Sequence, residues 1–456
     1  MLGLPSSPSR ASAPARARAA PAQVVVLGFL GAILVATVLL SLPVAHAPGA
    51  DVDVLEAAFT AVSAVCVTGH VVVDTATVWS PFGLTVIAVF IQLGGLGIML
   101  VASLIGLVLV RRFSLRNRIT TGAENRAVDF GDARRLARGI LVTSLLIEGA
   151  VAAVLAVRFL VHYDYPLGEA LWRGAFLAVS SFNNAGFAPW SDNMIGFATD
   201  PVVVLPMAIA TILGGLGFPV LRQLRKEFGR PLHWTMNTNI VLVMTGALLV
   251  LGTVYIAVLE WGNRATLGAH AVADRVLLAF VHSVQTRTAG FNSVDIGQMN
   301  PETWLGMDVL MFIGGGPAGT AGGIKVTTFA VLLFIIATEL RGDGAVNIFG
   351  KRLSRAVHRE AITIALLSLA AVMSATVALM MLTHLDLDVL LFEVVSAFGT
   401  VGLSTGITPS LGPAGQIILM VLMLLGRLGP LTLGTALVLR QRRTLYELPK
   451  ERPVIG

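Results

Sequence analysis

The chain has 456 residues, of which 55% are hydrophobic and only 13% are charged, and its formal net charge is +6. A soluble domain carries about 25% charged residues, so this composition excludes a water-soluble protein and indicates an integral membrane protein. The single cysteine, Cys66, excludes an intrachain disulfide and any metal site that needs several cysteines. The basic residues lie in short segments between apolar stretches, which indicates membrane topology and no nucleic acid partner.

Apolar stretches long enough to cross a bilayer, which takes about 20 residues, occur eight times. In chain order they are 23–45, 82–110, 137–160, 201–221, 239–260, 304–338, 361–383 and 414–439. Most Lys and Arg lie in the two tails and in the segments 111–138, 222–230 and 341–359, whereas the alternate segments are acidic. The positive-inside rule then predicts eight spans in the cytoplasmic membrane with both termini in the cytoplasm. A signal peptide is the alternative for the first stretch, but that stretch has the length of a span.

Each acidic outer segment contains a further apolar run that is too short to span and that ends near a glycine. The four glycines are Gly69, Gly186, Gly290 and Gly402, and ten residues before each stands a phenylalanine: Phe59, Phe176, Phe280 and Phe392. Six residues before the glycine, three copies have Ser63, Ser180 and Ser396, and the third copy has Val284. We therefore predict an all-α membrane protein of four concatenated helix–pore-loop–helix repeats around one pseudo-fourfold pore, with eight transmembrane helices and four half-span pore helices.

The repeats predict the following organisation. A cytoplasmic N-terminal tail covers 1–22, repeat 1 covers 23–110, a cytoplasmic loop covers 111–135 and repeat 2 covers 136–222. Repeat 3 covers 238–340, repeat 4 covers 359–440, and a cytoplasmic C-terminal tail covers 441–456.

A half-span helix followed by an extended segment is suited to conducting a cation. The C-terminal carbonyls of such a helix carry partial negative charge toward the membrane interior. The extended segment can turn its own carbonyls inward, where they replace the hydration shell of an ion. Non-helical backbone at membrane depth occurs only where it lines a cavity or is buried in protein. Four re-entrant loops that serve packing alone are the alternative interpretation.

The sixth apolar stretch is interrupted by a glycine-rich segment, 314–323. Its helix-breaking residues are Gly314, Gly315, Gly316, Pro317, Gly319, Gly322 and Gly323. A continuous helix would lose roughly 1 kcal/mol at each glycine and about 3 kcal/mol at the proline. We predict that the inner helix breaks here into a loop below the filter, where it can act as a gate; a kinked, static helix is the alternative. Milder glycine clusters in other inner helices, at Gly94, Gly95 and Gly97 and at Gly214, Gly215 and Gly217, predict close packing.

Ionisable residues inside predicted spans are functional candidates. Arg427 interrupts the last inner helix, and we expect it to bind carbonyls that the broken helix frees around 314–319 and so to hold the gate closed. Lys325 ends the broken segment, and we expect its amine to extend to the cytoplasmic edge. Glu148 lies in the third span and could pair with Arg287 to support the filter; an unpaired, neutral Glu148 is the alternative.

The order of these motifs resembles the Trk/Ktr/HKT superfamily of cation transporters, and most of all the bacterial Ktr-type potassium uptake membrane subunit. The phrases that carry the resemblance lie at 65–69 (Val-Cys-Val-Thr-Gly), 183–187 (Asn-Asn-Ala-Gly-Phe), 286–291 (Thr-Arg-Thr-Ala-Gly-Phe), 400–404 (Thr-Val-Gly-Leu-Ser) and 314–325. The resemblance covers about 23–445. It implies a homodimer in membrane lipid, one pore per subunit, potassium uptake, and regulation by a cytosolic nucleotide-binding ring. The matching position also makes Arg427 a pore-lining residue beneath the filter.

The resemblance also implies a filter whose backbone carbonyls bind K⁺. Its residues are Val67, Thr68, Gly69, Asn184, Ala185, Gly186, Thr288, Ala289, Gly290, Thr400, Val401 and Gly402. Glycine in all four copies favours potassium, because some plant relatives that conduct sodium have serine in the first copy. The residue after the glycine is Phe187, Phe291 or Leu403 in three copies but His70 in the first. His70 could make conduction pH-sensitive, and a solvated surface histidine is the alternative interpretation.

Other function classes fit less well. A secondary permease with broken helices needs inverted repeats, whereas these repeats share one orientation. A membrane enzyme needs a cluster of catalytic groups at membrane depth, which the predicted spans lack. A sodium-permeable or non-selective channel of the same fold stays open, as does sodium as a coupling ion. We expect no covalently bound cofactor, and we expect the loop 111–135, with Arg134 and Arg135, and the C-terminal tail to dock the regulatory ring.

Overall fold

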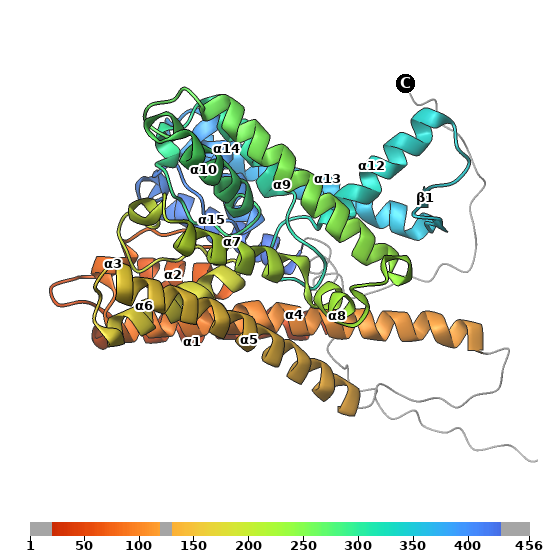
Figure 1. The fold of residues 1–456 in the computed structure, drawn as a ribbon, viewed down its shortest axis with the longest axis horizontal. Coiled ribbons are helices and arrows are strands. Elements are labelled where there is room, and N and C mark those ends of the chain that lie inside the picture. The colour runs from red at the N-terminus through yellow and green to blue at the C-terminus, as the bar shows by residue number, and fades with distance from the viewer. Residues whose placement is uncertain (1–20, 119–129, 430–456) are drawn as a thin grey trace, which may run out of the picture.

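We describe the fold from a computed structural model that covers residues 21–118 and 130–429 (Figure 1). The predicted tails 1–22 and 441–456 lie outside these ranges, apart from Pro21 and Ala22, and so does the centre of the predicted loop 111–135. The ends of that loop are helical instead, because α4 continues to Arg118 and α5 begins at Phe130.

The described residues are predominantly helical. The long helices are α1 (Pro21–Leu40), α4 (Pro81–Arg118), α5 (Phe130–His162), α9 (Met236–Glu260), α13 (Arg355–Leu382) and α15 (Gly412–Leu428). The inner segments of the second and third predicted repeats are α7 (Pro201–Leu216) with α8 (Phe218–Glu227), and α11 (Pro301–Phe312) with α12 (Val326–Arg341). The four shorter helices that precede the filter glycines are α2 (Val54–Cys66), α6 (Leu167–Phe182), α10 (Val272–Gln285) and α14 (Leu387–Gly399).

Minor elements connect these helices. They are α3 (Thr75–Val78), the antiparallel pair β1 (Asn347–Ile348) and β2 (Lys351–Arg352), and the 3-10 turns η1 (Pro43–Ala45), η2 (Ile195–Phe197), η3 (Pro231–His233), η4 (Leu267–Ala269), η5 (Ile296–Gln298) and η6 (Thr408–Leu411).

Among the described residues, six helices are long and apolar enough to cross a membrane, and α7 with α8 forms a seventh candidate. The predicted span 201–221 is not one straight helix, because the chain bends there by 100°. The bend occurs at Gly217, whose φ of +89° is a conformation that glycine adopts most easily. The predicted span 304–338 is divided into α11 and α12, which have 12 and 16 residues. The count of eight spans therefore stays a prediction.

Contacts between helices follow a cyclic order. The inner helices α4, α7, α11 and α15 contact the short helices α6, α10, α14 and α2, respectively, so each inner helix reaches the short helix of the next predicted repeat and the last one returns to the first. In Figure 1, α2 and α6 lie on one side of the molecule and α10 and α14 on the other. This arrangement brings four segments that are more than 100 residues apart in sequence to a common centre.

Acidic residues of the outer segments begin several of these helices. Asp53 and Glu56 form a capping box at the start of α2, which satisfies two backbone groups and complements the helix dipole. Asp200 caps α7 through the Val202 amide at 3.0 Å. Phenylalanines ten residues before the filter glycines pack inward: Phe59, Phe176 and Phe392 are buried, and Phe280 is half-buried.

Asp200 also accepts hydrogen bonds from the side chains of Arg158, at 2.8 Å, and Tyr163, at 3.0 Å. Burial alone would raise the pKa of Asp200, but these hydrogen bonds, the Val202 amide and the Arg158 charge lower it overall. Burial and the bond to Asp200 raise the pKa of Tyr163 to about 12. The carboxylate form of Asp200 therefore stabilises the junction of α5 and α7.

Candidate ion pathway

The four predicted filter segments form a closed ring. A Cβ added to Gly69 would lie 3.2 Å from the carbonyl carbon of Ala185, and one added to Gly186 would lie 2.7 Å from the Ala289 oxygen. A Cβ on Gly290 would lie 3.0 Å from the carbonyl carbon of Val401. A Cβ on Gly402 would lie 3.0 Å from the carbonyl carbon of Gly69, which closes the ring. Each glycine therefore faces the backbone of the next segment at a distance that leaves no room for a side chain.

The backbone of the ring has an unusual conformation that repeats in all four segments. The glycines Gly69, Gly186, Gly290 and Gly402 have φ values of +89°, +71°, +72° and +92°. Two residues earlier, Val67, Asn184, Thr288 and Thr400 also have positive φ, between +49° and +73°. Positive φ at non-glycine residues is uncommon, and such strain persists where the surrounding structure enforces it. The shared conformation indicates that the four segments do the same task.

The side chains of the ring are withdrawn from solvent. Thr68, Ala185, Ala289 and Val401, which lie between the two positive-φ positions, are all fully buried. Three of these four side chains are apolar, and the Thr68 hydroxyl has no hydrogen-bond partner among the described residues.

The serines six residues before the glycines differ in their roles. The Ser63 hydroxyl accepts a hydrogen bond from the Gly69 amide at 3.0 Å, and the Ser180 hydroxyl donates to the Phe187 carbonyl at 2.8 Å. The Ser396 hydroxyl has no hydrogen-bond partner among the described residues. The serine pattern in the sequence therefore marks filter support in the first two segments.

Glycines of the inner helices make room for the ends of the short helices. A Cβ added to Gly94 on α4 would overlap the Val65 carbonyl oxygen. In the same way, a Cβ on Gly214 of α7 would overlap the Phe182 carbonyl oxygen, and one on Gly426 of α15 the Phe398 carbonyl oxygen. Each carbonyl belongs to the residue four positions before a filter glycine. The glycine clusters in the sequence predicted close packing, and this is confirmed at Gly94, Gly95 and Gly214, where an added Cβ has no space. It is wrong at Gly97, where no atom lies within 4 Å of an added Cβ, and the close contact at Gly426 was not predicted.

The glycine-rich segment breaks the inner helix, as predicted, because α11 ends at Phe312 and α12 begins at Val326. Its backbone is bound to the end of α7. The Gly316 amide donates to the Gly215 carbonyl at 2.7 Å, and the Thr320 amide donates to the Gly214 carbonyl at 3.1 Å. We call residues 313–325 the broken segment.

The broken segment contacts two opposite segments of the ring. The Thr320 hydroxyl and the Asn184 side-chain amide are 2.8 Å apart. A Cβ on Gly322 would lie 2.8 Å from the Gly399 carbonyl oxygen, and closer still to the Thr400 hydroxyl. Since Asn184 and Thr400 belong to the second and fourth ring segments, the broken segment extends across the space next to the ring.

Three cationic side chains bind carbonyls of the broken segment. Arg427 donates to the Thr320 carbonyl and, at 3.2 Å, to the Gly94 carbonyl. Arg287 donates to the Gly314 carbonyl at 3.1 Å and to the Thr245 carbonyl at 3.3 Å. Lys325 donates to the Ala321 carbonyl at 2.6 Å. The two arginines are buried, so these carbonyls supply the acceptors that a buried guanidinium requires.

These contacts correct two expectations. Arg427 does bind the broken segment, but it contacts the Thr320 carbonyl and not a carbonyl of 314–319. Within 314–319, the Gly314 carbonyl is bound by Arg287 instead. The Lys325 side chain, which was expected to extend away from the segment, turns back onto it and donates to the Ala321 carbonyl four residues earlier.

The predicted ion pair between Glu148 and Arg287 is wrong. Both oxygens of the buried Glu148 carboxyl accept hydrogen bonds from Gln92 at 3.0 Å, and one accepts from Asn183 at 3.2 Å. Asn183 also donates to Gln92 at 2.6 Å and directly precedes the ring residue Asn184. Glu148 therefore supports the second filter segment through amides and does not support the third.

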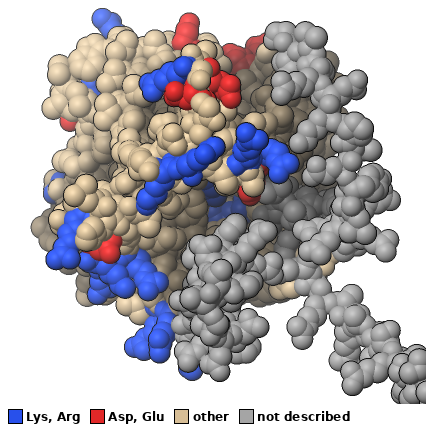
Figure 2. Space-filling model, turned by 90° about the vertical axis from the view of Figure 1, so that its right-hand side faces the viewer, with Lys and Arg blue, Asp and Glu red and all other residues tan. Residues whose placement is uncertain are grey.

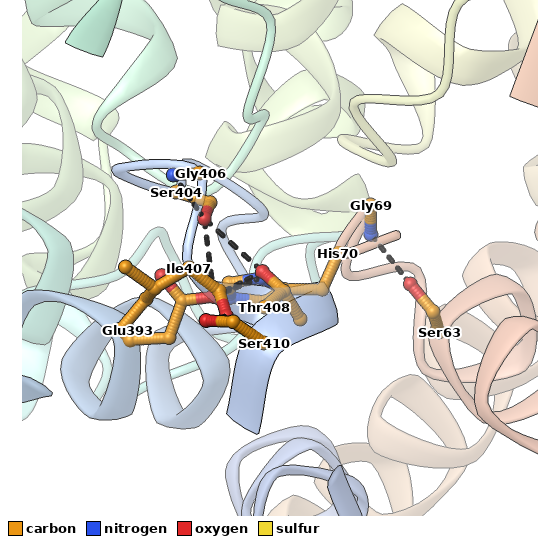
Figure 3. Close-up of polar contacts among 9 residues, drawn as sticks. All are labelled: Ser63, Gly69, His70, Glu393, Ser404, Gly406, Ile407, Thr408 and Ser410. Atoms are coloured by element: carbon orange, nitrogen blue, oxygen red, sulfur yellow. Dashed lines mark hydrogen bonds and ion pairs between the residues drawn. The ribbon is translucent and has the colours of Figure 1, made fainter. Parts of the chain in front are cut away.

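His70 is not a solvated surface histidine, since only 1% of it is exposed. Its Nδ1 lies 3.3 Å from Oε1 of the buried Glu393 on α14. The same oxygen accepts hydrogen bonds from Ser404, at 3.1 Å, and from Thr408. Figure 3 shows the His70 side chain extending from the residue after Gly69 toward this group. The contact connects the residue that follows Gly69 in the first filter segment to α14, the short helix that precedes the fourth filter segment.

Comparison with known proteins places the chain in a family. The profile of the cation transport protein family TrkH matches residues 17–443. The chain belongs to this family. It is 38% identical to the Ktr system potassium uptake protein B of Bacillus subtilis (strain 168), with 91% of this chain and 92% of that protein covered. It is 36% identical to the protein of the same name from Vibrio alginolyticus, with 97% and 96% covered.

Two further TrkH-family comparisons bear on function and fold. The potassium/sodium uptake protein NtpJ of Enterococcus hirae is 32% identical over 97% of this chain and 98% of its own length. The crystal structure of the potassium transporter TrkH from Vibrio parahaemolyticus matches the fold with a TM-score of 0.74 at 17% identity, covering 94% of this chain and 87% of that chain. The resemblance stated from the sequence motifs is thereby confirmed.

Several residues around the ring were not assigned a role from the sequence. Gln92, Asn183, Thr320 and Glu393 are polar residues in apolar or glycine-rich surroundings, which is a weak signal until their partners are known. Glu393 was visible only as one of several acidic residues of an outer segment. An acidic residue inside the short apolar run 387–399, where burial requires partners, is the feature that could have identified it.

Proposed function

We propose that this chain takes up potassium across the cytoplasmic membrane through a pore within a single chain, with the four-segment ring as its selectivity filter. The observation that carries the proposal is the closed ring of Gly69, Gly186, Gly290 and Gly402, each facing the backbone of the next segment. The shared positive φ values support the same conclusion, because this backbone conformation exposes carbonyls along one narrow path. Short helices end at the ring, and their C-terminal dipoles favour a cation there.

Potassium is the ion that the relatives favour. Two relatives are described as potassium uptake proteins and one as a potassium/sodium uptake protein. Glycine at all four ring positions allows the carbonyls to approach an ion without a side chain between them. A sodium-permeable or non-selective channel of the same fold is the second candidate, and the description of the Enterococcus hirae relative is what favours it.

The broken segment is proposed as the gate, and the described conformation is proposed to be closed. The carbonyls of Gly314, Thr320 and Ala321, which could otherwise contact a passing cation, are bound by Arg287, Arg427 and Lys325. Positive charge beside the path repels a cation at long range because little water screens it there. Opening requires the segment to leave its contacts with Gly214 and Gly215, which are a few hydrogen bonds of about 1 kcal/mol each.

Rubidium flux into proteoliposomes tests the function. The purified chain should transport rubidium, external potassium should compete with it, and sodium should compete poorly. Omission of sodium tests coupling, because a simple channel keeps its flux and a sodium-coupled transporter loses it. Equal competition by sodium and potassium supports the non-selective alternative, and flux no higher than in empty liposomes contradicts both candidates.

A cytosolic partner is proposed from charge and from the relatives. Relatives described as parts of a Ktr system suggest that this chain is also one subunit of a system. Arg134 and Arg135 are exposed near the start of α5, beside the loop for which docking was predicted. We propose that a homodimer of this chain docks a nucleotide-binding ring there, with both termini on the cytoplasmic side. Charge reversal of both arginines should weaken co-purification with the ring, and full nucleotide-dependent activity without a second subunit would contradict the proposal.

A further inference from the structure

A cavity of about 590 Å³ lies between α5 and α8, the helix that follows the bend at Gly217. Its rim includes four cationic residues: Arg135 from α5 and Arg222, Arg225 and Lys226 from α8. Its remaining lining is mostly apolar: Leu136, Gly139 and Val142 from α5 and Phe218 and Leu221 from α8, with Thr143 as the one neutral polar residue. We call this cavity the α5–α8 pocket.

The cations of the α5–α8 pocket have no acidic partner among the side chains that the structure describes. No acidic residue lines the pocket, and none of the four cations forms a hydrogen bond or an ion pair within the part of the chain that the structure describes. Glu227 follows Lys226 directly and lines a neighbouring pocket together with Arg222 and Lys226, where it accepts a hydrogen bond from Gln223 and forms no ion pair with either cation. Figure 2 shows a face of the molecule on which Lys and Arg also outnumber Asp and Glu. Four exposed cations without an ion pair to any described residue, beside an apolar lining, form a site suited to an anion with an apolar body.

The position of α8 indicates where that ligand comes from. Because the chain bends by 100° between α7 and α8, a helix α7 that crosses the bilayer places α8 along the membrane surface. The apolar residues Val220 and Leu224 of α8 pack against the neighbouring helices, and Arg222 and Arg225 are exposed. This distribution is that of an amphipathic helix at the level of lipid headgroups. Basic pockets between transmembrane helices at this level bind anionic headgroups.

We propose that the α5–α8 pocket binds an anionic phospholipid of the adjacent leaflet. The headgroup phosphate would lie among Arg222, Arg225 and Lys226 of α8, and an acyl chain would cover Leu136, Val142 and Phe218. Phe218 also donates its backbone amide to the Ala318 carbonyl of the broken segment at 3.2 Å, so the bound lipid would touch a residue that holds this segment. The binding proposal stands on the pocket alone and does not depend on which ion is transported.

Native mass spectrometry of the full chain in detergent tests the proposal. Phosphatidylglycerol is compared with phosphatidylcholine of the same acyl chains, and glycerol 3-phosphate serves as the headgroup without chains. Since each Lys or Arg near an anionic surface contributes about fivefold to binding, the double variant Arg222→Gln/Arg225→Gln should bind phosphatidylglycerol about thirtyfold more weakly. Arg230→Gln is the matched control, because Arg230 is exposed beyond the end of α8 and does not line the pocket. Its affinity should stay within about twofold of the parent chain.

A second variant separates the acyl-chain contact from the charge. A Cβ on Gly139 would lie 3.1 Å from the Phe218 ring, so Gly139→Leu fills the apolar floor and leaves all four cations in place. It should lower phosphatidylglycerol binding and leave glycerol 3-phosphate binding unchanged. Unaltered phosphatidylglycerol preference in the Arg222/Arg225 variant would overturn the proposal. If glycerol 3-phosphate binds as tightly as phosphatidylglycerol, the pocket is a site for free anions. If the Arg222/Arg225 variant keeps its lipid binding but no longer co-purifies with the regulatory ring, the pocket is a protein interface. Either result contradicts a lipid site.

Discussion

Replacing Gly290 by serine is the sharpest perturbation of the proposed filter. The added Cβ would lie 3.0 Å from the carbonyl carbon of Val401 and 3.2 Å from Cα of Gly402, and closer still to the Val401 carbonyl oxygen. Both neighbours are backbone atoms of the fourth segment, so the third and fourth segments must move apart. The φ of +72° at Gly290 adds strain of about 1–3 kcal/mol for a residue with a side chain.

Relief of this strain would displace the backbone carbonyls that are proposed to coordinate the ion. If it is released by widening the ring, the preference for potassium over sodium should fall by about 5- to 150-fold, which corresponds to the same 1–3 kcal/mol. The assay is rubidium flux into proteoliposomes, with sodium and potassium as competitors. Potassium uptake should weaken while sodium competition grows.

Gly406→Ser is the matched control for this prediction. Gly406 also has a positive φ, of +95°, and follows the fourth ring segment, but nothing lies within 4 Å of its added Cβ. It should carry the backbone strain without separating ring segments, so its ion preference should match that of the parent chain. A Gly290→Ser variant with normal folding and an unchanged potassium-to-sodium ratio would remove Gly290 from the filter.

Three further perturbations test other parts of the structure. Arg427→Ala removes two hydrogen bonds from a charged donor, worth about 1.5–3 kcal/mol each. At the lower value, about 3 kcal/mol in total, rubidium flux without the regulator should rise up to about 150-fold and selectivity should stay intact. Flux at or below that of the parent chain would indicate a structural brace. Asp200→Asn should destabilise the chain by about 1–3 kcal/mol at pH 7. Because the pKa of Asp200 is lowered in the folded state, the stabilisation that its carboxylate contributes is complete above pH about 4 and disappears as the pH falls through the lowered pKa. The melting temperatures of variant and parent should therefore converge in acid. Gln92→Leu leaves the Glu148 carboxyl with Asn183 as its one remaining donor and should lower thermal stability by about 1–3 kcal/mol; an unchanged melting temperature would show that this contact does not brace the filter.

Local features made much of this architecture predictable. The filter glycines were recognisable because each follows an apolar run that is too short to span, and the break at 314–323 because glycine and proline destabilise a helix wherever it lies. The bend at Gly217 was missed, since a glycine cluster in a span fits both close packing and a turn. The ends of α4 and α5 were missed for a similar reason, because charged residues end a membrane span without ending a helix.

The sequence by itself determined the membrane class, the repeated half-span segments and the positions of the buried charges, because composition and hydrophobic run length act through each segment's own transfer from water to lipid. Only the tertiary structure decided which groups those charges contact. Arg287 binds Gly314 and not Glu148, Glu148 binds Gln92, and His70 meets Glu393, which lies more than 300 residues away in sequence. A buried charge takes the acceptor or donor that packing brings within about 3 Å, and that proximity is created when four segments, far apart along the chain, close into one ring.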